Sequence, residues 1–367
     1  MNGPRPGVNR RNLFRLRSPA EPGPSAPRNE EQAEESPGAA DLVRVHRPAM
    51  GSYFEVRLGA RLPGAVDLAT RALDLVDELE AQLTVYREDS EVSRLNATAH
   101  LGPVPVEPAL FRLLEQAVNL GRLTGGAYDV TAGALSEAWG FTRGPKRVPD
   151  PVSLEHARAR TGWHHLRLDP AASTVAFDRP GICINLGSIG KGYAIDRAVA
   201  LIRDHWLPTS AMVHGGQSSL FALGSPPGRF GARWEVALRN PRDPERPLGV
   251  IRLRNRGLGT SGGAFQSFVA DGQVFGHILD PRTGRPAMGP ASVTVLAPTA
   301  AEADALSTAF YLLGPDGARE YVATRPDVAA IFVLEEARED RPRILTAGLR
   351  PEDFLIDPAA VDLMTTS

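Results

Sequence analysis

The hydrophobic positions between residues 65 and 83 recur every three or four residues, with charged side chains between them. This spacing predicts an amphipathic helix that buries one face. Similar stripes predict helices at about 108–123, from Gly192 onward, and at about 300–313. The pattern therefore predicts helices in both the first and the last third of the chain.

Short segments of alternating or continuous apolar residues predict strands between these helices. The alternation of Phe54, Val56 and Leu58 is one example. Other strands are expected at about 234–238, 250–253, 293–296 and 328–334. Because strands and helices interleave irregularly, we expect an α+β fold with mixed or antiparallel sheets and packed helices, rather than a doubly wound parallel sheet.

An Asp-Gly pair at residues 271–272 lies between two apolar-rich runs, which is the strongest short-range signal for a β-hairpin. A two-residue loop at this pair would set His277 opposite Gln266. It would also bring Arg282 beside Ser261. The glycines just before the hairpin let backbone N–H groups approach a bulky or anionic ligand closely. The segment fits either a phosphate site or a tight hairpin that holds a histidine.

The composition narrows the classes of function. The chain has 367 residues, 42% of them hydrophobic, and a formal net charge of -2. Near-neutral charge argues against a protein that binds nucleic acid or an anionic membrane without specificity. Cys183 is the only cysteine, so the chain forms neither an intramolecular disulfide nor a cysteine-based metal site. No apolar run reaches the roughly 20 residues that a transmembrane helix needs.

Residues 1–41 are rich in proline, arginine and glutamate, and this composition predicts a disordered tail. We expect a folded domain at residues 42–350 and a C-terminal tail at residues 351–367. Residues 9–16 loosely resemble a twin-arginine export signal, but a segment with prolines and a glutamate follows where an apolar region should be. We therefore expect no signal peptide and a cytoplasmic protein.

Two segments carry residues that suit phosphate chemistry. Asp304 and Thr308 are four residues apart in the last predicted helix, so they share a face, and their oxygens suit a hard cation such as Mg²⁺. Residues 185–192 form a glycine-rich turn before a helix, a natural anion site to which Lys191 adds a positive charge. An ordinary helix start and a turn that only needs glycines are the alternatives. The spacing is not that of a P-loop.

Two aromatic residues could contact a flat ring. Tyr128 precedes Asp129 after the end of a predicted helix, and Tyr86 precedes a charged segment. A packed turn and a solvated surface are the alternatives for these two segments. No histidine pair has the spacing of a zinc site, and no Gly-x-Ser-x-Gly motif supports a serine hydrolase.

The order and spacing of these segments together resemble the ApbE family, the FAD:protein FMN transferases. The resemblance extends from about residue 44 to residue 347. The matching segments are Met50-Gly-Ser, residues 86–96, residues 127–131 with 139–141, residues 186–193 with Asp196, Gly215-Gly216, residues 260–262, residues 277–284 and residues 304–308.

The resemblance implies an α+β, T-fold-like architecture and a Mg²⁺-dependent enzyme. It implies that FAD is split, that FMN is attached through a phosphoester to a threonine or serine hydroxyl of an acceptor flavoprotein, and that AMP leaves. The implied metal ligands are Asp304, Thr308 and the backbone carbonyl of Ser188. The implied FAD contacts are Met50, Tyr86, Ala127, Tyr128, Asp129, Asn185, Lys191 and Leu279.

This chain departs from the family pattern at Asn185, where the family often has aspartate, and after Gly215-Gly216, where it lacks the usual acidic or asparagine residue. His277 is the best candidate for the catalytic base, because an unperturbed imidazole titrates near neutrality. Asp280 is a weaker candidate, since Asp-Pro followed by Thr-Gly is ordinary turn chemistry. The alternative functions are metal-dependent hydrolysis of FAD to FMN and AMP, and flavin binding without catalysis.

Overall fold

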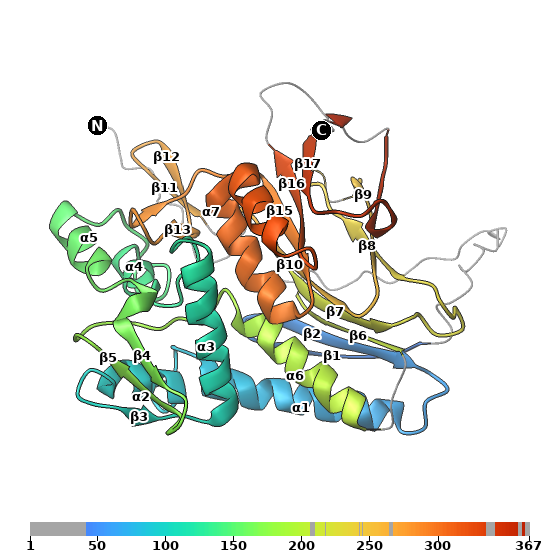
Figure 1. Cartoon of the computed structure of the whole chain (residues 1–367), viewed down its shortest axis with the longest axis horizontal. Helices are drawn as coiled ribbons and strands as arrows, with labels where there is room; N and C mark the ends of the chain where they lie inside the picture. The colour runs from blue at the N-terminus through green and yellow to red at the C-terminus, as the bar shows by residue number, and fades with distance from the viewer. Residues whose placement is uncertain are drawn as a thin grey trace, which may run out of the picture. The chain divides into compact units, whose positions relative to one another are not determined.

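The structure is a computed structural model (Figure 1). It describes residues 42–205, 210–216, 218–241, 243, 245–263, 267–334, 342–358 and 362–363.

A nine-stranded sheet forms the centre of the fold, with the strand order β1-β2-β6-β7-β10-β15-β16-β17-β19. Its strands are β1 Leu42–Ala49, β2 Ser52–Gly59, β6 Ser210–Gly215, β7 Ser219–Gly224, β10 Arg256–Ser261, β15 Ser292–Ala297, β16 Ala329–Leu334, β17 Arg343–Ala347 and β19 Asp362–Leu363. Neighbouring strands are antiparallel except for β17 and β19, which are parallel. This arrangement confirms the α+β class with antiparallel sheets.

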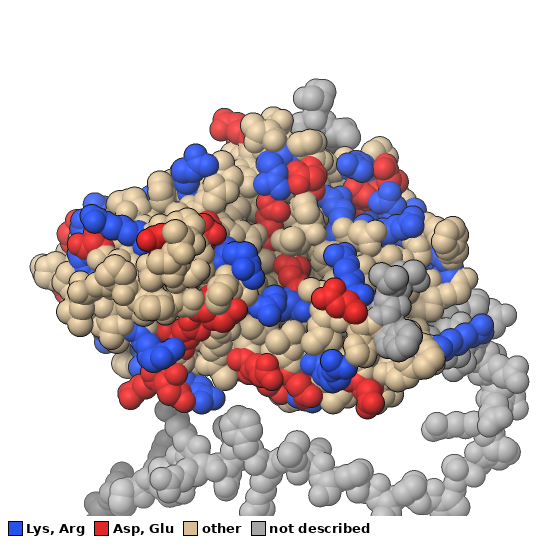
Figure 2. All heavy atoms as spheres, turned by 60° about the horizontal axis from the view of Figure 1, so that its bottom comes forward, with Lys and Arg blue, Asp and Glu red and all other residues tan. Residues whose placement is uncertain are grey.

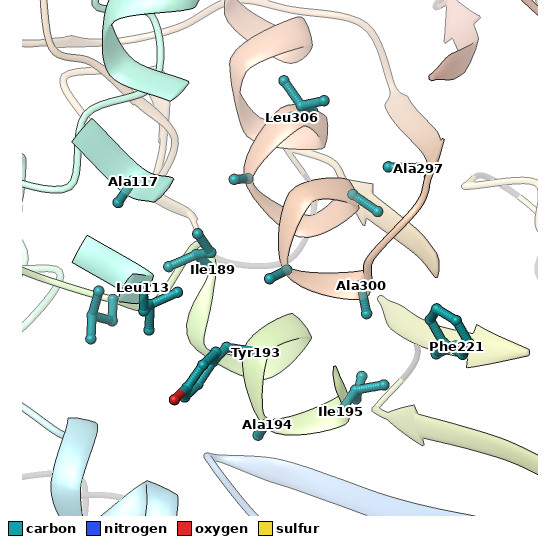
Figure 3. Packing of buried hydrophobic residues seen from close by; sticks show 14 of the residues in the cluster. Leu113, Ala117, Ile189, Tyr193, Ala194, Ile195, Phe221, Ala297, Ala300 and Leu306 are labelled. Carbon is teal, nitrogen blue, oxygen red and sulfur yellow. The ribbon is translucent and has the colours of Figure 1, made fainter. Parts of the chain in front are cut away.

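Three helices cover one face of this sheet: α1 (Ala65–Leu83), α6 (Gly190–Asp204) and α7 (Ala300–Thr324) (Figure 1). Figure 3 shows Tyr193, Ala194 and Ile195 of α6 in the same buried layer as Ala300 and Leu306 of α7. The apolar stripe predicted at residues 65–83 is therefore the buried face of α1.

The opposite face of the sheet is covered by a second, three-stranded sheet with the order β18-β9-β8. Its strands are β8 Trp234–Leu238, β9 Gly249–Leu253 and β18 Phe354–Ile356. A separate apolar cluster, which includes Trp234, Leu258 and Ile331, fills the space between the two sheets. Because β18 pairs with β9, the folded part continues beyond residue 351, where we had expected the C-terminal tail to begin.

The remaining elements lie at one side of these layers. The helices are α2 Glu91–Thr98, α3 Pro108–Leu123, α4 Gly133–Ala138 and α5 Pro151–Arg158, with a 3₁₀ turn at Trp163–His165. A second 3₁₀ turn, Pro351–Asp353, lies against β9 and β18 instead. The short strands are β3 Val104–Pro105, β4 Leu166–Asp169, β5 Thr174–Phe177, β11 Ser267–Ala270, β12 Gln273–Gly276, β13 Leu279–Asp280 and β14 Arg285–Pro286. No helix in the described part of the chain is long and apolar enough to cross a membrane.

The predicted helix at 300–313 is longer in the structure. The helix α7 continues to Thr324, across a kink at Gly314, whose φ of 70° and ψ of -176° are not helical. The sequence Gly314-Pro315 predicts a helix end, because proline cannot donate to the preceding turn and disfavours helical dihedrals in the residue before it. The second half is stabilised by packing, with Ala318 and Tyr321 buried.

The predicted hairpin is confirmed as β11 and β12. Ala270 pairs with Gln273, and the two loop residues have φ values of 49° and 75°, as a two-residue turn of primed type requires. Gln266, the predicted partner of His277, lies outside the described residues. The ladder ends at Ser267 and Gly276, so the predicted proximity of Arg282 and Ser261 is not part of it.

Close packing of α7 on β10 requires two glycines. A Cβ atom at Gly257 would lie 2.4 Å from the backbone nitrogen of Ala300, and one at Gly259 would lie 2.4 Å from the carbonyl of Ala303. Distances this short are incompatible with a side chain unless the backbone moves. The helix therefore approaches the sheet only because these two strand positions have no side chain.

We expect Gly259→Ala to lower the free energy of unfolding by about 1–3 kcal/mol, because the added methyl group overlaps the backbone of α7. Denaturant unfolding measures this change. Gly102→Ala is the matched control, since a Cβ atom there meets nothing within 4 Å. Equal stability of the Gly259→Ala variant and the wild type would contradict the close-packing argument.

Candidate active site

Asp304 lies in the first half of α7 with its carboxylate buried against α6 and β7. Its Oδ1 accepts a hydrogen bond from the Ser219 hydroxyl at 3.0 Å, and its Oδ2 accepts one from the backbone N–H of Gly192 at 3.2 Å. Burial raises the pKa of Asp304, and the positive charge of Lys191 opposes this shift. A carboxylate that is buried in this way is a favourable position for a cation.

The hydrogen bond from Gly192 changes the start of α6. In a regular helix the N–H of residue 192 would bond to the carbonyl of residue 188. Here that N–H is directed at Asp304, and the backbone hydrogen bonds of the described residues include none to the Ser188 carbonyl. The carbonyl predicted to be a metal ligand is thus not used by the helix.

Thr308 lies one turn after Asp304, and the hydroxyl of Ser261 contacts both Thr308 and Ser307. Ser261 Oγ is 3.2 Å from Thr308 Oγ1 and 2.8 Å from Ser307 Oγ. Ser307 in turn donates to the backbone carbonyl of Asp304 at 2.7 Å. The end of β10 and the face of α7 therefore present several oxygen atoms next to each other.

Tyr128 adds a buried hydroxyl group to the same region, and the Ser188 side chain is its polar neighbour. Ser188 and Asp304 are both near enough to influence its ionisation, but burial dominates and raises the pKa of Tyr128. The Tyr128 hydroxyl therefore adds one more oxygen atom beside the Asp304 carboxylate.

These donors fit the implied magnesium ion. The carboxylate of Asp304, the hydroxyl of Thr308 and the carbonyl of Ser188 are all hard oxygen ligands, which Mg²⁺ prefers. No cluster of three or more histidine, cysteine, aspartate or glutamate residues occurs among the described residues, so a softer metal has no ligand set there.

Lys191 and Asn185 flank the same turn. Lys191 is in the first turn of α6, where its charge acts on Asp304. Asn185 Oδ1 accepts the backbone N–H of Gly187 at 2.9 Å, which shapes the turn. Aspartate, which the family often has here, could accept the same bond, so the departure at Asn185 preserves the local structure.

Asp129 was expected to contact FAD, but its carboxylate is engaged within the protein. One oxygen accepts from the backbone and the hydroxyl of Thr131 at 2.8 and 2.6 Å, and the other accepts from the backbone of Trp163 at 2.7 Å. Burial raises the pKa of Asp129. Its side chain therefore fixes the loop after α3.

His277 follows β12 and lies against an aromatic cluster. Its ring centroid is 6.5 Å from that of Phe141, in an edge-on arrangement. Leu279 is buried next to Trp139, whose indole N–H donates to the Gly284 carbonyl at 2.9 Å. These contacts hold the segment that carries the predicted base against α4.

The other three predicted FAD contacts lie on separate segments. Met50 begins the turn between β1 and β2, Ala127 is buried after α3, and Tyr86 follows α1 with 65% of its surface exposed. No hydrogen bond in the described part of the chain joins Met50 or Tyr86 to Asp304 or its partners. The structure therefore groups Thr308, Ser188, Tyr128 and Lys191 around Asp304. Ala127 directly precedes Tyr128, and Met50 and Tyr86 lie on other segments.

Asp196, named above only within a segment that matches the family, has a structural role. Its two oxygens accept the backbone N–H groups of Ala300 and Ala301, each at 2.8 Å, and so tie α6 to the start of α7. The site residue that sequence reasoning missed is Ser219, because its partner Asp304 is 85 positions away along the chain.

Figure 2 shows lysine and arginine interspersed with aspartate and glutamate on the visible face, without a continuous field of one sign. The fold and site thus define a class: an α+β protein with a buried carboxylate beside a glycine-rich helix start, and a histidine that follows a hairpin. The model of the ApbE family matches residues 50–332. The chain belongs to the ApbE family.

Relatives with this fold are flavin transferases. The chain is 31% identical over 314 residues to the FAD:protein FMN transferase of Salmonella typhimurium, covering 83% of this chain and 88% of that protein. It is 32% identical over 320 residues to the FAD:protein FMN transferase of Treponema pallidum, covering 81% of this chain and 88% of that protein.

Solved structures agree with this assignment. The ApbE protein of Thermotoga maritima matches with a TM-score of 0.75 at 29% identity, over 83% of this chain and 97% of that chain. The flavin transferase ApbE of Vibrio cholerae matches with a TM-score of 0.72 at 27% identity, over 83% of this chain and 97% of that chain. The resemblance inferred from the sequence is confirmed.

Asp196 gives a pH-dependent prediction. Burial raises its pKa from 3.8 to about 7. Because the folded-state pKa exceeds the unfolded one, its contribution to stability is complete below about pH 4 and is lost as the pH rises through about 7. Between about pH 4 and about pH 7, the wild type should lose up to about 1.4 kcal/mol per pH unit relative to Asp196→Asn, which cannot ionise.

Urea unfolding at several pH values measures this difference. Asp204→Asn removes an exposed carboxylate at the end of the same helix. Its free energy of unfolding should fall with rising pH as much as that of the wild type. If Asp196→Asn and the wild type respond identically to pH, the buried carboxyl does not titrate in this range.

Proposed function

We propose that this chain transfers FMN from FAD to a threonine or serine hydroxyl of an acceptor flavoprotein and releases AMP. The observation that carries the proposal is the Asp304 carboxylate, buried beside the start of α6, with the Gly192 N–H directed at it. The names of its relatives support the same activity. We assign this transferase activity to the folded part of the chain, which begins near residue 42 and includes β18.

Magnesium would be held by Asp304, Thr308 and the Ser188 carbonyl, and it would neutralise charge on the phosphates of FAD. Lys191 supplies a second positive charge, and the N–H groups at the start of α6 favour an anion at the same end of the helix. The pyrophosphate is thus surrounded by groups that stabilise negative charge. Tyr86, Met50 and the backbone near Asp129 are assigned to the remaining parts of FAD.

The reaction is a displacement at phosphorus by the acceptor hydroxyl. The acceptor oxygen forms a new O–P bond to the phosphorus of the FMN half. The P–O bond to AMP breaks, and its electron pair leaves with AMP. The hydroxyl proton passes to the imidazole of His277, which Phe141 contacts edge-on.

Asp304→Ala should abolish metal-dependent transfer, since it removes the only carboxylate of the proposed metal site. Purified protein is incubated with FAD, Mg²⁺ and an extract of cells that lack its gene, and covalent flavin is detected by fluorescence after denaturing electrophoresis. Asp316→Ala, at an exposed carboxylate of the same helix, is the control and should retain activity.

The outcomes of this experiment separate the candidate functions. A fluorescent acceptor band that disappears with EDTA supports transfer. Free FMN and AMP without a labelled protein would support hydrolysis, and intact FAD would contradict both enzymatic functions. Full labelling by the Asp304→Ala variant would refute the proposed metal site.

His277→Ala should lower kcat by about 10²–10⁴-fold, the usual contribution of a general base, while FAD affinity changes little. Rates come from the release of AMP in the presence of acceptor, and affinity comes from the quenching of flavin fluorescence. His156→Ala, at an exposed histidine of α5, should behave as the wild type. An unchanged kcat in the His277→Ala variant would exclude His277 as the base.

A further inference from the structure

A cavity of about 440 Å³ lies on the opposite side of the central sheet from α6 and α7. On each strand that gives two side chains to its floor, these are two or four positions apart, which is the pattern of one sheet face. The floor residues are Tyr53 and Arg57 of β2, Met212 and His214 of β6, Leu220 of β7, Leu258 and Thr260 of β10, and Ser292 and Thr294 of β15.

The wall of the cavity follows a different pattern. Residues 235–241 line it without interruption. The face of a strand would contribute only every second residue, so this unbroken run means that the backbone edge of β8 faces the cavity. The strand β8 is the last in its sheet, with β9 on one side and no other described strand on its second edge. Such an edge presents N–H and C=O groups to which another strand can bind.

The cavity contains none of the residues predicted to bind FAD or the metal, yet it reaches the active site. Ser219 is one of its lining residues, and the hydroxyl of Ser219 donates to Asp304 at 3.0 Å. Gly216 and Gly262 line the same end and have no side chain that would close it. The cavity therefore excludes the predicted FAD contacts, and at Ser219 it ends one residue away from the Asp304 carboxylate.

Three charged side chains line the cavity: Arg57, Glu235 and Arg239. Arg57 is ion-paired with Glu55, and Glu235 is ion-paired with Arg252 at 3.2 Å. Burial lowers the pKa of His214, so the imidazole is neutral near pH 7. Apolar side chains and hydroxyl groups make up much of the floor, which suits short apolar and polar side chains in alternation rather than phosphate.

We propose that this cavity binds an extended segment of the acceptor protein, as an added strand on β8, with its hydroxyl-bearing residue directed past Ser219 toward Asp304. The proposal rests on the proposed function, which requires a second, polypeptide substrate. Backbone hydrogen bonds to β8 give affinity that is independent of sequence, and the floor selects the side chains. FAD enters from the α6 and α7 side of the sheet, and the acceptor enters from the other side.

The test uses a synthetic peptide as the acceptor. Twelve-residue peptides with one central threonine and random flanks are screened for flavin transfer by the wild type with FAD and Mg²⁺, and the most strongly labelled peptide is the probe. Val236→Trp is then compared with the wild type, because Val236 packs toward the cavity floor from β8. We expect the KM for the peptide to rise at least tenfold, with unchanged affinity for FAD.

Leu355→Trp is the matched control. Leu355 is an exposed residue of β18, at the other edge of the same small sheet, and it does not line the cavity. It should leave the KM for the peptide unchanged. Hydrogen exchange on the wild type provides a measurement without substitution: the backbone amides of residues 235–238 should become protected when the peptide binds.

Each failure has a distinct meaning. An unchanged KM in Val236→Trp, or no added protection in β8, would overturn the acceptor cavity while leaving the transferase activity intact. Cleavage of FAD without labelling of any peptide would also overturn it, since an extended segment would then be insufficient. Absence of FAD cleavage under all conditions would instead refute the proposed function. Protection of β8 by protein concentration alone would indicate that a second copy of the chain occupies the edge.

Discussion

The close approach of α7 to the central sheet and to α6 is the constraint on which the site depends. Gly257 and Gly259 leave room for the helix on β10, and a Cβ atom at Gly192 would lie only 2.2 Å from the carbonyl of Ala300. Asp196 fixes the same contact by accepting two N–H groups of α7. Three positions without side chains and one buried carboxylate thus determine where Asp304 lies.

This packing also explains why the carboxylate has so few partners. Asp304 is deep enough that burial raises its pKa, and it receives one hydroxyl and one backbone N–H. The N–H comes from Gly192, so the same contact that brings the helices together leaves the Ser188 carbonyl without its helical partner. Structural packing and the arrangement of oxygen ligands are therefore two results of one contact between α6 and α7.

Local patterns in the sequence predicted much of the fold. The apolar spacing at 65–83 matched α1, and Asp-Gly at 271–272 matched the hairpin, because both signals are confined to neighbouring residues. The four-residue spacing of Asp304 and Thr308 likewise predicted a shared face. Contacts between distant segments could not be predicted from local patterns. Nothing near Ser219 in the sequence indicates its hydrogen bond to Asp304. The helix α7 continues past Gly314 because of packing and not because of local preference.

The most direct test of the central claim is a crystal structure of the protein with FAD and Mn²⁺, which replaces Mg²⁺ in oxygen sites and is identified by anomalous scattering. The account predicts an anomalous peak at about 2.1 Å from an oxygen of Asp304 and from Thr308 Oγ1, next to the pyrophosphate. A manganese ion bound elsewhere, or FAD bound without a cation at Asp304, would contradict it.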